Sequence, residues 1–142
     1  MRVFLDTNVW VAAVATNGLC QDLVTVCLSD HVVLTCDLSR RELFDVVSRK
    51  LRPPNGVLKW IKELWAMTVA IEDAPLRLGS PDERLVAAAA TAGADLFVTE
   101  DKEVLARRHV GPMRIVSPRD AWLILLAAPP AWRAHRQTAA AI

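Results

Sequence analysis

The sequence predicts an α/β protein in which a mainly parallel sheet of about five strands lies between two layers of helices. Short, continuous apolar runs recur along the 142 residues, as expected for strands that are covered on both faces. Most runs are followed by a longer segment with apolar residues at helical spacing. Acidic residues stand where several of the runs stop. Together these observations favour a three-layer α/β/α sandwich with right-handed crossovers.

Five segments are predicted to be strands because they are short, apolar and bounded by polar or turn residues. In chain order they are residues 3–5, 31–35, 69–71, 96–99 and 113–116. The first stops at Asp6, and Asp101 follows shortly after the fourth. In a parallel sheet the carboxyl ends of the strands meet at one crevice, so acids that are distant in sequence can lie together there.

Seven helices are predicted between and after the strands from their start and stop signals. These signals are, in order, the capping residues 6–8, the break at Asn17-Gly18, a start at about Leu38 or Ser39, the stop at residues 53–56, the Ser80-Pro81 start, the Gly93 stop, Asp101 and the Ser117-Pro118 start. Serine followed by proline is typical of a helix N-terminus, and glycine is typical of the position after a helix.

Length and composition favour one domain, because 142 residues with a 53% hydrophobic fraction suffice for a single core. We expect residues 1–128 to form this domain and residues 129–142 to be a flexible or partner-binding tail. No apolar run is long enough to span a bilayer and the first residues form a strand, so a cytoplasmic protein is expected. Cys20, Cys27 and Cys36 form no CxxC pair, which favours buried free thiols.

The candidate functional site consists of acids at strand ends and helix starts, namely Asp6, Glu42, the adjacent Asp82 and Glu83, and Asp101. Each one alone is better explained as a helix cap or as a first-turn acid, which stabilises a helix by ~1 kcal/mol. Four such positions around one crevice favour a divalent cation, since a cation relieves the repulsion between carboxylates. Asn8 and Thr99 are candidates to orient these carboxylates.

Four segments of the chain resemble PIN domains, and most of all the bacterial toxin-type members related to the VapC ribonucleases. The segments are residues 4–10, 39–43, 82–87 and 93–101, and the resemblance covers about residues 1–126. It implies a Rossmann- or flavodoxin-like sheet. It also implies that Asp6, Glu42, Glu83 and Asp101 are the metal ligands and catalytic acids, with Asp82 as a substitute for Glu83 at the third position.

The activity that the resemblance implies is RNA cleavage by an endoribonuclease that depends on Mg²⁺ or Mn²⁺. Arg40, Arg41, Arg84 and Lys102 lie beside the acids in sequence and are candidates to contact RNA as a group, although any single one of them is better explained as a solvated charge. The net charge of +1 excludes binding by bulk electrostatics alone. His31, His109 and His135 lie outside the motifs.

The resemblance implies a cognate antitoxin protein as a partner, and we also expect a homodimer. Exposed apolar residues around Trp60 and Trp65 are candidates for either interface, but packing of amphipathic helices against the core explains these residues equally well. The tail residues Trp132, Arg133 and Arg136 are another candidate contact.

Other functions fit the sequence less well. A haloacid-dehalogenase-type phosphatase needs a second Asp where this chain has Asn8, and a receiver domain needs a Lys after the last strand. A dinucleotide-binding domain needs a GxGxxG motif after the first strand, and none is present. The remaining alternative is a catalytically silent PIN-like module that binds protein or RNA.

Overall fold

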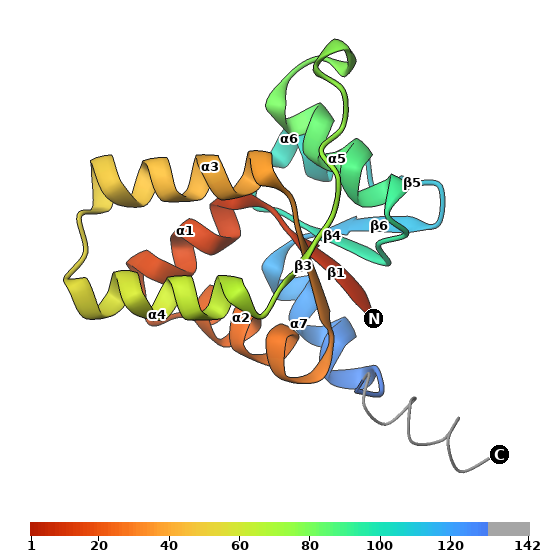
Figure 1. The fold of residues 1–142 in the computed structure, drawn as a ribbon. Helices are drawn as coiled ribbons and strands as arrows, with labels where there is room; N and C mark the ends of the chain where they lie inside the picture. The colour runs from red at the N-terminus through yellow and green to blue at the C-terminus, as the bar shows by residue number, and fades with distance from the viewer. Residues whose placement is uncertain (131–142) are drawn as a thin grey trace, which may run out of the picture.

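The structure, a computed structural model, describes residues 1–130, so most of the predicted tail lies outside the described residues. A sheet with the strand order β3-β2-β1-β4-β6-β5 forms the centre of the molecule (Figure 1). Its strands are β1 (Arg2–Leu5), β2 (Val32–Thr35), β3 (Val69–Ala70), β4 (Leu96–Val98), β5 (His109–Val110) and β6 (Met113–Val116). All neighbouring pairs are parallel except β5 and β6.

The predicted α/β architecture is confirmed, with one strand more than the sequence indicated. The additional strand is β5, which forms an antiparallel hairpin with β6 at the edge of the sheet. Gly111, with a φ of 56°, takes the left-handed conformation in the turn between them. Two residues are too short to give a periodic signal, so pairing with β6 is what makes this segment a strand.

Within residues 1–130, seven α-helices connect and cover the strands, as predicted. They are α1 (Thr7–Ala15), α2 (Leu19–Asp30), α3 (Asp37–Val46), α4 (Asn55–Ala66), α5 (Pro81–Thr91), α6 (Lys102–Leu105) and α7 (Pro118–Ala127). The side chains of Ser80 and Ser117 cap α5 and α7, and a proline opens each of these helices. A π-helical turn, Val47–Leu51, lengthens α3 and ends at Arg52, where φ is 41°.

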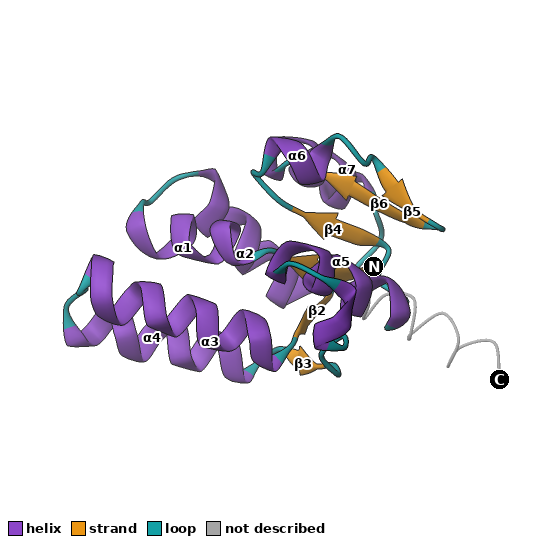
Figure 2. Cartoon of the chain, turned by 90° about the horizontal axis from the view of Figure 1, so that it is seen from above, coloured by secondary structure: helices purple, strands orange, loops and turns teal. Residues whose placement is uncertain are grey.

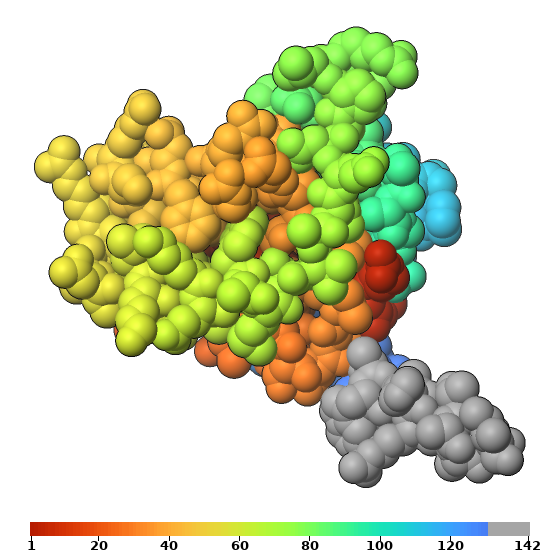
Figure 3. All heavy atoms as spheres, viewed as in Figure 1, coloured from red at the N-terminus to blue at the C-terminus, as the bar shows by residue number. Residues whose placement is uncertain are grey.

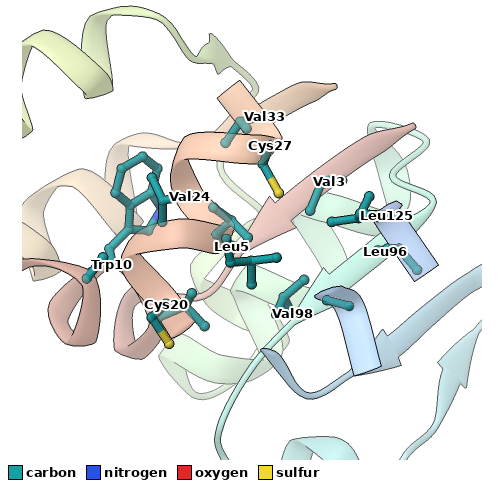
Figure 4. Packing of buried hydrophobic residues seen from close by; sticks show 14 of the residues in the cluster. Val3, Leu5, Trp10, Cys20, Val24, Cys27, Val33, Leu96, Val98 and Leu125 are labelled. Atoms are coloured by element: carbon teal, nitrogen blue, oxygen red, sulfur yellow. The ribbon is translucent and has the colours of Figure 1, made fainter. Parts of the chain in front are cut away.

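Alternate residues of the strands face two separate cores. Val3 and Leu5 of β1 point into a core that is covered by α1, α2, α3, α4 and α7 (Figure 4). Phe4, between them, points to the other side, where α5 and α6 cover the sheet. There its ring stacks on that of Phe97 in β4, with ring centroids 5.3 Å apart. Because both faces are covered, β1 and β4 are apolar throughout their buried length.

Helices α3 and α4 are joined by residues 52–54; α1 lies between them in the view of Figure 1, and the two helices overlap when seen from above in Figure 2. Trp65 of α4 contacts Trp10 of α1 and Phe44 of α3, with ring centroids 4.9 Å and 6.0 Å apart. Trp60 is also half-buried against this core. Of the two interpretations of these tryptophans, the structure therefore supports core packing.

The thiols of Cys20, Cys27 and Cys36 are free and buried, as predicted. Burial raises the pKa of the Cys27 thiol to about 12. Within residues 1–130, no single helix is long and apolar enough to cross a membrane; only α1 and α2 taken together, bent by 114°, have the required length and composition.

Trp10 provides a test of the larger core. It is fully buried, and its indole Nε1 has no hydrogen-bond partner within residues 1–130. We expect Trp10→Ala to lower the free energy of unfolding by about 3–5 kcal/mol. Trp10→Phe should cost less than about 2 kcal/mol, because it also removes a buried N–H group that has no partner. Urea denaturation followed by far-UV circular dichroism measures both, and equal losses would contradict this account of the indole.

Candidate functional site

Asp6 lies at the carboxyl end of β1 and caps α1. Its side chain is nearly inaccessible, at 4% exposure. The Oδ1 atom accepts the Thr7 N–H at 2.7 Å, so the interpretation of Asp6 as a helix cap is correct. The other oxygen, Oδ2, accepts hydrogen bonds from the Thr99 hydroxyl at 2.8 Å and from the Asn8 amide at 3.2 Å. These two contacts go beyond what a cap requires.

Thr99 and Asn8 tie together the ends of the two central strands. β1 and β4 are parallel neighbours with Leu5 opposite Val98, so the residues that follow each strand meet. The Thr99 hydroxyl donates to Asp6 and accepts the Asp101 N–H at 3.0 Å. The Asn8 side chain donates to Thr99 Oγ1 at 3.2 Å and accepts the Glu100 N–H at 3.1 Å. This network holds the loop that carries Asp101 beside Asp6.

The environment of Asp6 disfavours its charge. Burial raises the pKa of the Asp6 carboxyl to about 6 from an ordinary 3.8. The hydrogen bonds from Thr99 and Thr7 oppose this rise, whereas the negative charges of Asp82 and Glu42 add to it. Without a cation, the site therefore holds a carboxylate at an energetic cost. A bound cation would remove this cost and favour the charged form.

Glu42 reaches the site from α3. Its Oε2 accepts a hydrogen bond from the Thr7 hydroxyl at 2.9 Å, which places the carboxylate beside the residue that follows Asp6. The nearby acids Asp37 and Asp45 are occupied elsewhere, since Asp37 pairs with Arg40 and Arg41 and Asp45 pairs with Arg49. Among the acids of α3, Glu42 is thus the one that contacts the segment following Asp6.

Asp101 caps the short helix α6. Its Oδ1 accepts the backbone N–H groups of Glu103 at 2.9 Å and Val104 at 3.4 Å. In the described part of the chain its Oδ2 accepts no hydrogen bond. One oxygen of this carboxylate is therefore held in place by the helix, and the other is free to bind a ligand.

The two adjacent acids of α5 differ in their surroundings. Partial burial, followed by the charges of Asp101 and Glu103, raises the pKa of Asp82, and Asp82 in turn raises the pKa of Asp6. The Glu83 side chain is folded against Gly79, so closely that a Cβ at position 79 would collide with its Oε2. Of the two acids of α5, it is therefore Asp82 that interacts electrostatically with Asp6 and Asp101. Asp82 is the residue that the resemblance to PIN domains implied as a substitute for Glu83.

The four basic residues predicted to contact RNA differ in their surroundings. Arg40 and Arg41 pair with Asp37, at 2.6 Å and 3.0 Å. Arg84 is only 9% exposed, and its Nε donates to the carbonyl oxygen of Ala74 at 3.3 Å, which anchors the segment between β3 and α5. This segment projects from the molecule (Figures 1 and 3). Lys102 is exposed and follows Asp101 directly.

The donor set suits a hard cation, although the side chains do not form a closed cage. Asp6, Glu42, Asp82 and Asp101 offer only carboxylate oxygens, which are the ligands of Mg²⁺ and Mn²⁺. Among residues 1–130, no three His, Cys, Asp or Glu side chains converge closely enough to hold an ion by themselves. Mg²⁺ usually keeps several waters and binds through one or two carboxylates, so the open arrangement is compatible with it.

A cavity of about 470 Å³ is lined by both acids of α5, Asp82 and Glu83. Glu103 and Arg107 also line it, and neither residue was among the candidates predicted from the sequence. The sequence signal for them was weak: Glu103 is a second acid two residues after Asp101, in a helix of only one turn. Only the packing of α6 against α5 shows that they share a cavity.

No protein-family model matches the chain, and no curated protein sequence does. Solved structures do match. VapBC2 from Rickettsia felis, in a crystal structure with a DNA fragment from its promoter, matches with a TM-score of 0.61 and 15% identity, over 82% of this chain and 98% of that one. PAE2754 from Pyrobaculum aerophilum matches with a TM-score of 0.65 and 18% identity, over 90% and 91%.

Both matches cover nearly the whole of the compared chains, and they agree with the resemblance carried by the four sequence segments. At this level of identity they establish the fold. The chain has a PIN-like α/β/α fold.

Proposed function

We propose that this protein is a Mg²⁺- or Mn²⁺-dependent endoribonuclease and the toxin of a toxin–antitoxin pair. The observation that carries the proposal is the buried Asp6 carboxylate, which Thr99 and Asn8 hold at the junction of β1 and β4. Asp82 and Glu42 interact electrostatically with it, and Asp101 is positioned by the same threonine. A buried carboxylate with a raised pKa among other acids is typical of functional sites.

Asp6, Glu42, Asp82 and Asp101 are the residues that would hold the cation. Bound there, Mg²⁺ or Mn²⁺ would supply the activation of water and the stabilisation of charge on the leaving 3′-oxygen. Thr99 and Asn8 fix the orientation of Asp6, so that one geometry is present before substrate binds. Cleavage by water would leave 5′-phosphate and 3′-hydroxyl ends on the RNA.

The choice of Asp82 as the third acid rests on charge placement. Asp82 interacts with both Asp6 and Asp101, whereas Glu83 is turned toward Gly79. We therefore assign the role to Asp82 and not to Glu83.

The likeness to a VapBC2 structure supports the toxin role and a small antitoxin partner. A homodimer and a cytoplasmic location belong to the same proposal. Leu123 and Leu126 of α7 are 61% and 59% exposed and are apolar candidates for such an interface. Of the tail contacts proposed from sequence, Trp132, Arg133 and Arg136 lie outside the described residues.

A catalytically silent PIN-like module is the second candidate. The observation in its favour is that no three acidic, histidine or cysteine side chains among residues 1–130 converge as a ligand group. A silent module would need the acids only as helix caps, a role that Asp6 and Asp101 do fill. Metal binding and cleavage separate the two candidates.

The first prediction concerns Asp6→Asn. The wild-type protein should cleave single-stranded RNA in Mn²⁺ or Mg²⁺ and not in EDTA. Asp6→Asn should lower kcat/KM by roughly 100-fold, since a catalytic metal site contributes several kcal/mol. Asp45→Asn is the matched control, because it makes the same change on an exposed part of α3. Equal cleavage by wild type and Asp6→Asn would remove the proposed site.

The second prediction separates the two acids of α5. Asp82→Asn should impair cleavage about as much as Asp6→Asn and should abolish the rise in Tm that Mn²⁺ produces in the wild type. Glu83→Gln should retain both properties, because its carboxylate lies against Gly79. Thermal melting with and without Mn²⁺ gives a readout that does not depend on activity. The reverse pattern would return the role to Glu83.

The third prediction follows from the raised pKa of Asp6. Because its pKa is about 6 in the folded protein and 3.8 ordinarily, the folded state binds the proton more tightly. The contribution of Asp6 to the free energy of unfolding therefore falls by at most about 3 kcal/mol as the pH rises from about 4 to 6. Above pH 6 it stays at this lower value. In EDTA, the Tm of wild type relative to Asp6→Asn should rise as pH is lowered from 7.5 to 5. A pH-independent difference would contradict the pKa.

A further inference from the structure

The cavity beside the acids has the character of a ligand site. Its volume of about 470 Å³ lies within the range of small-molecule pockets. Val86 of α5 and Val104 of α6 are buried and form apolar walls, and Leu78 lines the cavity from the segment between β3 and α5. Apolar walls of this kind suit a flat aromatic ring.

Asp82 joins the cavity to the proposed metal site. It lines the cavity and also interacts electrostatically with Asp6 and Asp101. A nucleotide whose phosphate lies at the acids would therefore have the cavity within reach of its own base or of the neighbouring base. This location distinguishes the cavity from the surface pocket along α4, which none of the candidate acids lines.

Two charged groups of the cavity, Glu103 and Arg107, have no partner within the described residues. Glu103 and Arg107 are exposed and form no ion pair in the described part of the chain, although both belong to the same cavity. Glu83 also lines the cavity, but its carboxylate is folded against Gly79. Glu103 therefore remains available to a ligand as a hydrogen-bond acceptor, and Arg107 remains available as a donor.

This combination of groups matches one nucleobase best. Guanine presents two parallel donors, N1–H and N2–H, which one carboxylate accepts together, and it presents O6 and N7 as acceptors for an arginine. Adenine and cytosine offer a carboxylate only one amino group, and uracil offers only its N3–H between two carbonyl acceptors. We propose that the cavity is a guanine subsite, in which Glu103 accepts from the base and Arg107 donates to it.

This proposal rests on the proposed nuclease function and gives it a specificity. The scissile phosphate would be one that adjoins a guanosine, because the cavity and the acids share Asp82. Single-stranded or looped RNA is the expected substrate class, since a base must be unpaired to enter a pocket.

The test uses short oligouridine RNAs that carry a single central guanosine, inosine or adenosine. Inosine lacks only the 2-amino group of guanine. In Mn²⁺ the wild-type protein should cut beside the guanosine, with kcat/KM lowered roughly tenfold for inosine and at least as much for adenosine. Glu103→Gln should reduce the ratio of guanosine to inosine cleavage to about one, because an amide cannot accept both donors.

Glu72→Gln is the matched control, since Glu72 is exposed and does not line the cavity. It should keep the wild-type preference. If Glu103→Gln also keeps it, or if wild type cuts all three RNAs equally, the subsite is overturned while the nuclease function stands.

A binding measurement separates failure of the subsite from failure of the nuclease. Fluorescence anisotropy of the same labelled RNAs in EDTA should show tighter binding of the guanosine RNA than of the inosine RNA. Glu103→Gln should abolish this difference. Equal affinities, or no measurable binding, would remove the subsite whether or not the protein cleaves RNA. A guanine preference in binding without any cleavage would support the subsite and contradict the proposed nuclease function.

Discussion

The hydrogen bond from the Thr99 hydroxyl to the buried Asp6 carboxylate is the interaction on which the candidate site depends. It joins the residues that follow the two central strands, and the same hydroxyl accepts the Asp101 N–H. A buried carboxylate is costly to charge, as the raised pKa of Asp6 shows. The contacts from Thr99, Thr7 and Asn8 lower this cost without cancelling it. The protein thus holds a group that is poorly stabilised without a cation.

The same arrangement connects stability with the proposed chemistry. Asp82 and Glu42 repel the Asp6 charge, and Asp101 repels that of Asp82, so the acids oppose folding to a small extent unless a cation lies among them. The apolar cores on the two faces of the sheet provide the compensation. Rigid strands at the centre and helix starts at the rim place the acids where loops alone would not hold them. The cavity between α5 and α6 extends this region toward a larger ligand.

Most of the fold was predictable because the local sequence signals for strands and helices agree with the overall fold. The apolar runs of β1, β2, β4 and β6 and the Ser-Pro starts of α5 and α7 are short-range features. β5 was missed because two residues carry no period, and the π-helical turn after α3 was missed because nothing in sequence distinguishes it from an α-helix. Asp6, Asn8 and Thr99 were identified together from sequence, and the structure brings them into contact.

The sequence by itself determined the α/β order, the covered strands and the placement of acids at strand ends, because periodicity and capping are local properties of the chain. Tertiary structure alone decided how those acids differ. It distinguished Asp82 from Glu83, one residue apart on the same helix, because only packing sets which carboxylate lies near Asp101 and which lies against Gly79. It also placed the Arg84 side chain against the carbonyl oxygen of Ala74 and brought Glu103 and Arg107 to the cavity that Asp82 lines. Distances between residues that are far apart in sequence arise from the packing of helices on the sheet, and no local pattern encodes them.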